Sequence, residues 1–175
     1  MRPALPIAGP RAAFAAIALA IAASPAAALD SCAIGVWEAD ANDIAHLMAT
    51  TMNGTAEHVS GTAHMVITAD GIAEIIANNL TINVVVAGTP PIEVVVTGYS
   101  RGLFEADGGA WRYSTVDFEL IGSADVLGQR MTIPITSDTG MFGNAEGIYG
   151  CSETSMSFDA GDDLPRFPRR WTRVG

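Results

Sequence analysis

The segment 98–102, Gly-Tyr-Ser-Arg-Gly, has the spacing of a nucleophilic serine held between two glycines. In serine hydrolases that use this motif, the serine lies on a sharp turn between a strand and a helix, and an acid and a histidine follow it in the chain. Here a strand-like run, 103–105, follows the motif, and all three histidines precede Ser100. We therefore predict a strand kinked by its glycines and a protein that is not an enzyme.

Two histidines with nearby carboxylates are candidates for a metal site. His58 and His64 lie close in sequence to Glu57 and Asp70, and imidazole suits zinc or copper. The spacing matches no compact metal motif, and Gly61 lies between the two histidines. The interpretation that we prefer places both histidines at exposed or strand-edge positions.

Alternating acids could serve glycoside hydrolysis. Asp117 and Glu119 occupy the same face of a predicted strand as Trp111 and Tyr113, and alternate residues on a strand are roughly 6.5–7 Å apart. Paired carboxylates beside aromatic rings are typical of sugar-cleaving sites. Acids on one exposed strand face are the more common explanation, so we expect no catalytic residues here.

Acidic loops are the remaining metal candidates. One loop contains Asp159, Asp162 and Asp163, and the other contains Asp138 and Asn144. Neither has the ligand spacing of a known calcium loop. We predict solvated surface loops and no metal or cofactor.

Composition excludes several classes of protein. The chain has 175 residues, of which 49% are hydrophobic and 16% charged, and its net charge is −10. It contains no lysine, nine arginines and 19 acidic residues. A nucleic-acid partner is excluded because phosphate binding needs a basic surface. The apolar fraction excludes a disordered chain, and the length favours one domain.

The first 28 residues have the order of a secretory signal. Arg2 and Arg11 flank the start, the run 12–23 is apolar, and a proline and small residues follow up to position 28. The apolar run is shorter than the roughly 20 residues that span a bilayer. We predict a signal peptide, 1–28, a mature domain, 29–175, without a transmembrane segment, and a secreted or periplasmic location. An uncleaved anchor is the alternative.

The two cysteines remain in the predicted mature domain. Cys32 and Cys151 lie near its two ends, and pairing is the usual fate of two exported thiols. We predict a disulfide between them, which would restrict the unfolded chain. The alternative is lipidation of Cys32 after cleavage in the segment 29–32, which would leave Cys151 unpaired.

The mature domain has one predicted helix followed by strands. Ile44, Leu47, Met48 and Met52 recur at helical spacing, between a capping residue at Asp40 or Asn42 and a stop at Asn53-Gly54. Beyond position 54, apolar alternation and turn residues predict strands. The predicted strands are 62–69, 72–86, 92–105, 111–121, 130–135, 146–152, 154–159 and 170–174. About eight or nine strands joined by short turns predict an all-β, antiparallel up-and-down barrel.

The two ends of the domain resemble lipocalin-like (calycin) barrels. Gly35-Val36-Trp37 begins the domain and Trp171-Thr172-Arg173 ends it. The resemblance implies that Trp37 closes the barrel floor and that Arg173 packs over it, with Arg170 as a substitute. With Tyr149-Gly150-Cys151, the chain is also similar to small exported bacterial β-barrel proteins of unassigned role.

This resemblance and the strand pattern suggest a barrel that binds a small apolar or amphipathic ligand. The residues that we expect to line its interior are Met65, Ile67, Ile76, Leu80, Ile82, Val94, Val96, Phe118, Met131, Ile133, Met156 and Phe158. Methionine supplies an adaptable apolar wall. Small barrels are often filled by their own side chains, however.

The alternative is a filled barrel that acts through its outer surface as an envelope structural or interaction module. A contact patch on outward faces would then contain Tyr99, Leu103, Trp111 and Tyr113. An envelope protein would be the partner in that case.

Overall fold

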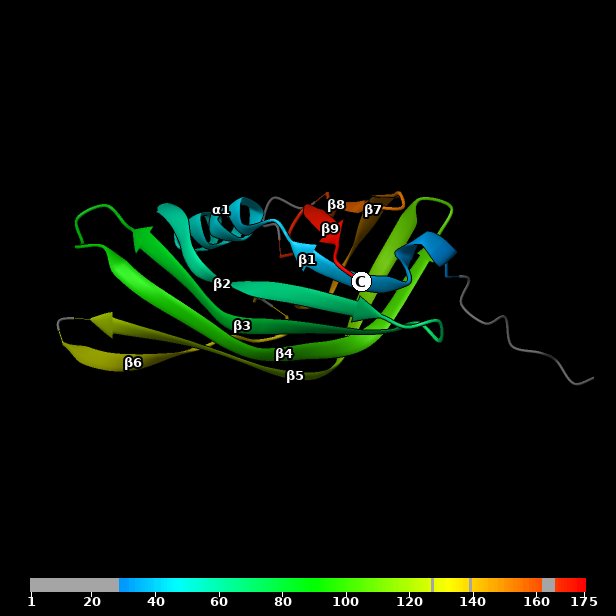
Figure 1. The fold of residues 1–175 in the computed structure, drawn as a ribbon. Coiled ribbons are helices and arrows are strands. Elements are labelled where there is room, and N and C mark those ends of the chain that lie inside the picture. Colours follow the sequence, from blue (N-terminus) through cyan, green and yellow to red (C-terminus); the bar gives the residue numbers. More distant parts are fainter. Residues whose placement is uncertain (1–28, 127, 139, 162–165) are drawn as a thin grey trace, which may run out of the picture.

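The computed structural model describes residues 29–126, 128–138, 140–161 and 166–175 (Figure 1). The predicted signal peptide, 1–28, lies outside the described residues. The elements in chain order are η1 (Ser31–Ala33), β1 (Gly35–Ala39), α1 (Ala41–Thr51), β2 (Thr55–Ile67), β3 (Ile72–Val85), β4 (Ile92–Asp107), β5 (Ala110–Val126), β6 (Gln129–Pro134), β7 (Ala145–Cys151), β8 (Ser155–Asp159) and β9 (Arg170–Arg173).

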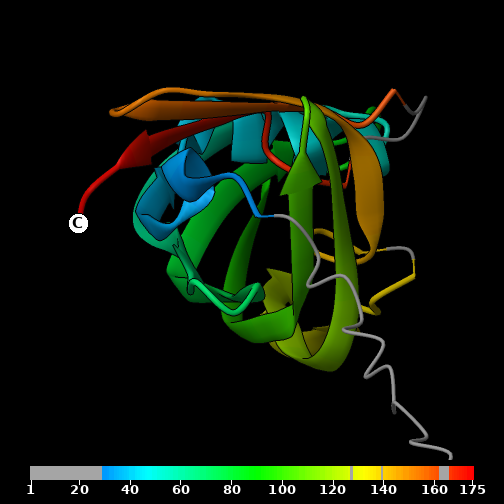
Figure 2. The ribbon, with the colours of Figure 1, turned by 90° about the vertical axis from the view of Figure 1, so that its right-hand side faces the viewer.

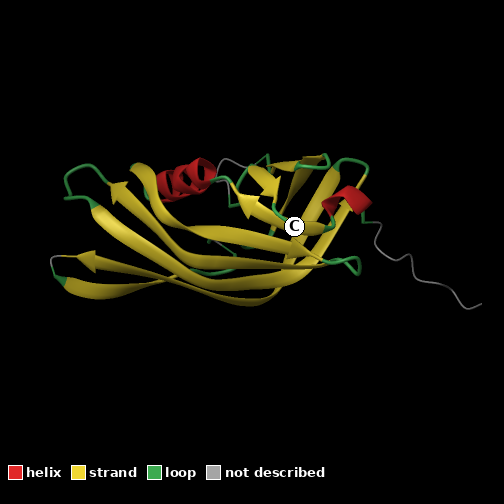
Figure 3. Ribbon diagram, in the orientation of Figure 1, coloured by secondary structure: helices red, strands yellow, loops and turns green. Residues whose placement is uncertain are grey.

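The strands form a closed antiparallel barrel with one strand outside it. The sheet order is β4-β3-β2-β1-β9-β8-β7-β5-β6, and pairing of β4 with β5 closes eight strands into the barrel. Figure 2 looks along this closed arrangement, and Figure 3 shows that strands dominate the described chain. The predicted all-β, antiparallel barrel is confirmed. Strand β6 lies outside because β5 is long enough to pair with β7 at its start and with β6 at its end.

Helix α1 has the limits that its sequence predicts. The Asp40 carboxylate accepts hydrogen bonds from the backbone N–H groups of Asn42 and Asp43, which satisfies donors that the first turn leaves free. Asn53 has a positive φ of 50° just beyond the helix. The helix buries Ile44 and Leu47 and packs across β2 and β3. It therefore covers one end of the barrel (Figure 1).

Strand β2 begins seven residues earlier than its alternation predicts. Its register with β3 shifts twice between His58 and Thr62, so the strand is bulged there. Gly61 has a φ of +81°, and a Cβ at this position would collide with the carbonyl oxygen of Asn79. The alternation of apolar residues changes phase across this bulge. The first half of the strand therefore does not continue the pattern that predicts the second half.

Strand β3 also changes phase, which corrects one predicted interior residue. Ala73, Ile75 and Ala77 are buried, whereas beyond Asn79, whose φ is 47°, the buried residues have the opposite parity and begin with Leu80. The register with β4 shifts at the same place. Ile76 is consequently on the outer face and 42% exposed, so its prediction as an interior residue is wrong.

A bulge in β5 places two aromatic residues inside the barrel. The register with β4 shifts at Gly102, which leaves Val116 as an extra, exposed residue. Trp111 and Tyr113 are almost fully buried, although Asp117 beyond the bulge is exposed. Trp111 and Tyr113 therefore neither share a face with the acids nor contribute to an outer patch, contrary to both predictions.

Aromatic rings fill the part of the barrel near β7, β8 and β9. The ring of Trp111 lies 4.5 Å from that of Phe158 and 5.0 Å from that of Phe167, measured between centroids. Phe167 also contacts Trp171, at 5.6 Å. This end of the interior is packed with side chains, so a ligand cavity has to lie elsewhere. Within the described ranges, no helix has the length and apolar character needed to cross a bilayer.

Candidate ligand-binding cavity

The serine of the Gly-x-Ser-x-Gly motif is a buried strand residue. Ser100 lies within β4, pairs with Phe118 of β5 and is fully buried. Its hydroxyl hydrogen-bonds the Tyr113 hydroxyl at 2.8 Å inside the barrel. Burial raises the pKa of Tyr113 to about 12, and the hydrogen bond to Ser100 acts in the opposite direction. The two hydroxyls satisfy one another, and the strand continues past them without the turn that a nucleophile needs.

The histidines have separate partners. His64 Nε2 lies 3.0 Å from a carboxylate oxygen of Glu38, and His58 Nε2 lies 3.0 Å from the carbonyl oxygen of Gly61. In the part of the chain that the structure describes, no three histidine, cysteine or acidic side chains gather closely enough to hold a metal. His58 and His64 are only partly buried.

The acidic candidates are also distributed over the surface. Asp117 accepts a hydrogen bond from the Tyr99 hydroxyl at 2.9 Å, and this bond is the main reason that the pKa of Tyr99 is raised. Asp138 accepts from the side-chain amide of Asn144, and Asp159 accepts from the backbone of Gly161. The other two members of the acidic loop, positions 162 and 163, lie outside the described residues.

The residues named for the barrel floor are in contact. The guanidinium carbon of Arg173 lies 4.1 Å from the ring centroid of Trp37, which is fully buried. Arg173 donates hydrogen bonds to the carbonyl oxygens of Cys32, Ile34 and Glu153, at 2.6, 2.7 and 2.6 Å. Arg170, the named substitute, instead binds Asp43 in α1 at 2.9 Å.

The two cysteines are at disulfide distance. Cys32 precedes β1 and Cys151 ends β7, and their Cα atoms are 6.1 Å apart. The pairing agrees with the predicted disulfide and uses the Cys32 sulfur that lipidation would need. Because Arg173 binds the carbonyl oxygen of Cys32, the bridge and the arginine fix the same stretch of chain.

An apolar cavity of about 210 Å³ lies at the end of the barrel beneath α1. Helix α1 forms one wall, and β4, β5 and β6 form the opposite wall. Residues of the chain after β6 and before β9 complete the rim. The lining residues are Leu47, Met48, Thr51 and Met52 from α1, Val94, Val96, Gly122, Ile133 and Pro134 from the strands, and Ile135, Thr136, Gly140, Met141 and Arg166 from the rim.

The walls of the cavity combine close strand packing with flexible helix side chains. Gly122 of β5 is buried and pairs with Ile133 of β6, which lies so close that a Cβ added to the glycine would meet Ile133 Cβ at 3.1 Å. The helix side chains that line the cavity include the flexible methionines Met48 and Met52. Helix α1 is held in position by Arg170 of β9, which hydrogen-bonds the Asp43 carboxylate through its backbone N–H and its side chain.

Three of the predicted interior residues line this cavity: Val94, Val96 and Ile133. Six others are buried in the packed core, namely Met65, Ile67, Leu80, Ile82, Met156 and Phe158. Phe118 is partly buried against that core. Met131 pairs with the buried Ala124, and its side chain is 54% exposed, so it is not a buried interior residue.

Sequence reasoning did not assign the helix residues or the rim residues to the lining of the cavity. Leu47, Met48 and Met52 belong to the apolar stripe that predicts the helix, but that stripe does not say what it covers. Met141 and Arg166 lie in irregular segments without periodicity, 25 positions apart in sequence. The N–H of Phe142 donates to the carbonyl oxygen of Arg166 at 2.9 Å, which brings the two segments together. No local signal indicates such a contact.

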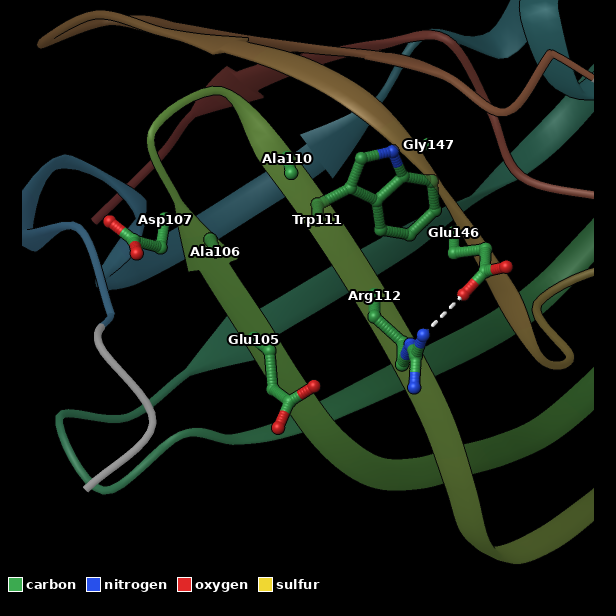
Figure 4. Close-up of a pocket in the computed structure, with 8 residues that line it drawn as sticks. All are labelled: Glu105, Ala106, Asp107, Ala110, Trp111, Arg112, Glu146 and Gly147. Atoms are coloured by element: carbon green, nitrogen blue, oxygen red, sulfur yellow. Dashed lines mark ion pairs between the residues drawn. The ribbon is translucent and has the colours of Figure 1, made fainter. Parts of the chain in front are cut away.

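An open groove of about 690 Å³ lies near the β4–β5 hairpin, and Figure 4 shows the side chains that line it. Arg112 forms an ion pair with Glu146 at 2.8 Å across it, and Glu105 and Asp107 add further charge. The Trp111 indole nitrogen is buried beside it without a hydrogen-bond partner among the described residues. The groove is open and its carboxylates are solvated, whereas the smaller cavity beneath α1 is more enclosed and apolar.

Comparison of the chain with protein-family models, with curated proteins and with solved structures finds no match. The architecture itself defines the class: a closed, eight-stranded antiparallel β-barrel with an extra strand, consistent with a calycin-like barrel.

Proposed function

We propose that the protein is an exported, lipocalin-like barrel that binds a small apolar or amphipathic ligand in the cavity beneath α1. The observation that carries this proposal is the apolar lining of the cavity, to which Met48 and Met52 of α1 and Met141 of the rim contribute. Ligand sites are typically concave and mostly apolar, with few polar groups. The cavity joins these features in a barrel whose remaining interior is packed.

The volume limits the size of the ligand. Ligand pockets commonly measure about 300–1,000 Å³, so a cavity of about 210 Å³ is small. An apolar cavity of about 150 Å³ accepts benzene, and on that scale this one accepts about eight non-hydrogen atoms. A short alkyl chain or a single substituted ring is the expected occupant.

Export is part of the proposal. The charge and hydropathy order of residues 1–28 supports it, as does the disulfide-distance pair of Cys32 and Cys151, because disulfides persist in oxidising compartments. An intact-mass measurement of protein recovered from culture medium and from periplasm tests cleavage after residue 28. A retained N-terminal segment in all fractions would contradict export by this route.

Calorimetric titration with 1-octanol tests the binding proposal. We expect saturable binding of one molecule to the wild-type protein. Val96→Phe extends a ring from β4 into the cavity and should abolish that binding. The matched control is Val95→Phe, because Val95 precedes it on the same strand and has the opposite orientation.

Two outcomes of these titrations would contradict the proposal in different ways. If wild-type protein with a cooperative thermal transition shows no saturable heat with 1-octanol, the binding proposal is wrong. Equal loss of binding in both valine variants would place the ligand elsewhere. The alternative function was contact with an envelope partner through the outer surface of the barrel. Trp111 and Tyr113 are buried and cannot belong to such a contact patch, so we do not propose that function.

A further inference from the structure

One charged side chain lines the apolar cavity. Arg166 lies at the rim, and the other lining residues are aliphatic, methionine, threonine, glycine or proline. Among the residues that the structure describes, no carboxylate belongs to the lining, and Arg166 is the one charged residue in it.

Four of the six other arginines in the described ranges have side-chain partners, whereas Arg101 and Arg169 have none there. Arg112 and Arg130 pair with Glu146 and Asp125, and Arg170 pairs with Asp43. Arg173 binds three carbonyl oxygens. Within the ranges that the structure describes, the side chain of Arg166 has neither a hydrogen bond nor an ion pair.

The backbone of Arg166 is nevertheless firmly positioned. Its carbonyl oxygen accepts from the N–H of Phe142, which is fully buried. The next residue, Phe167, is buried against Phe142 at a ring distance of 6.4 Å and against Trp111 at 5.0 Å. The backbone of Arg166 is thus fixed at the rim of the cavity, and its guanidinium, which has no partner in the described ranges, is available to an anion.

We propose that the ligand is a small amphipathic carboxylate, whose head binds Arg166 and whose apolar tail fills the cavity beneath α1. This inference rests on the proposed function and adds the class of ligand. The planar guanidinium presents parallel N–H donors that match the two oxygens of a carboxylate. The cavity takes about eight non-hydrogen atoms of the tail, on the scale of benzene in a cavity of about 150 Å³.

The methionines that line the cavity could by themselves bind a copper ion, but the nearby arginine disfavours a cation. Thioether sulfurs bind Cu(I), and Met48, Met52 and Met141 all line the cavity. A cation would be repelled by Arg166 and would find no carboxylate among the described lining residues. The same methionines serve an alkyl tail well because they adapt to its shape.

Three probes that each contain eight carbons test the inference: octanoate, 1-octanol and octylamine. Each is titrated calorimetrically into the wild-type protein and into Arg166→Gln, Arg166→Lys and Arg169→Gln. Arg169 is the matched control because it is a nearby exposed arginine that does not line the cavity. Thermal unfolding of each variant checks that the fold is retained.

We expect octanoate to bind the wild-type protein at least about tenfold more tightly than 1-octanol does, with octylamine weakest. Arg166→Gln should remove that advantage and leave 1-octanol unchanged, and Arg166→Lys should retain part of it. Arg169→Gln should behave as the wild type.

Two other results would overturn the inference in distinguishable ways. If 1-octanol binds but octanoate has no advantage, or if Arg166→Gln leaves that advantage intact, the cavity binds ligand but not through this arginine. If no probe binds a folded wild-type protein, the proposed function fails together with the inference. Tightest binding by octylamine would assign the opposite charge to the ligand.

Discussion

The guanidinium of Arg173 covers the indole ring of Trp37, 4.1 Å from its centroid, and so joins the last strand of the barrel to the first. The two residues are also directly paired in the β1–β9 ladder. The arginine reaches further, to the carbonyl oxygens of Cys32 and Ile34. One side chain therefore closes the barrel between segments that are about 140 residues apart in sequence.

Replacement of Arg173 should weaken this closure. Arg173→Lys keeps the charge but loses the planar fork, so we expect the free energy of unfolding to fall by about 1–3 kcal/mol, from lost hydrogen bonds and cation–π contact. Urea denaturation measures the effect. Arg130→Lys is the control, since Arg130 is largely exposed and its partner is 3.8 Å away. Equal midpoints for the two variants would refute a closing role.

Removal of the disulfide should destabilise the same region. The Cys32–Cys151 pair closes a loop of 119 positions. In the chain-entropy description a loop of this length contributes up to about 4–5 kcal/mol, and measured values are often about 2–4 kcal/mol. The double variant Cys32→Ser, Cys151→Ser should therefore unfold at lower urea concentration. Reductant should shift the wild type by a similar amount and leave the double variant unaffected.

Adjacent isoleucines of β3 offer a direct test of its change of phase. Ile75 is fully buried and Ile76 is on the outer face. Ile75→Ala should lower the free energy of unfolding by about 2–5 kcal/mol, because it leaves a cavity in the core. Ile76→Ala should change it by roughly 0.5 kcal/mol or less. A larger loss for Ile76→Ala, measured by chemical denaturation, would show that the strand has the opposite orientation.

Alkaline pH should destabilise the barrel through its buried phenols. Burial raises the pKa of Tyr113 to about 12 in the folded protein, against about 10 in the unfolded chain. Between these values the folded state binds more protons, so stability is complete below pH 10 and declines as pH rises towards 12. Unfolding midpoints measured across this range should fall.

Tyr113→Phe separates this contribution from the others. The variant leaves the buried Ser100 hydroxyl without its partner, so it should be less stable at neutral pH. Its alkaline decline should nevertheless be smaller than in the wild type. Some decline should remain, because burial and the hydrogen bond to Asp30 also raise the pKa of Tyr149. An unchanged pH profile would exclude Tyr113 as a source.

Much of the fold follows from local pattern. Alternating apolar residues and turn signals predict the barrel, and Asp40 with Asn53-Gly54 predicts the limits of α1. The errors are concentrated at bulges. Ile76 and Trp111 were assigned to the wrong faces because an extra residue reverses the parity of a strand, and such an extra residue is defined by its pairing with the neighbouring strand.

The candidate site was less accessible to sequence reasoning than the fold. Val94, Val96 and Ile133 follow from strand alternation, since their inward faces are apolar. The helix wall needs knowledge of where α1 packs, which depends on the contact of Arg170 with Asp43. Arg166 has no sequence feature that separates it from Arg169, and its contact with the cavity depends on the pairing of its backbone with Phe142.

Local sequence is enough to predict the class of secondary structure, the position of the helix and the chemical nature of the two ends, because these features depend on neighbours within a few residues. Which apolar side chains fill the barrel and which line a cavity depends on the folded chain, because it follows from strand register across bulges and from contacts between segments distant in sequence. Met48 of α1 and Arg166, which are far apart in sequence, line the same cavity because the folded chain brings their two segments together.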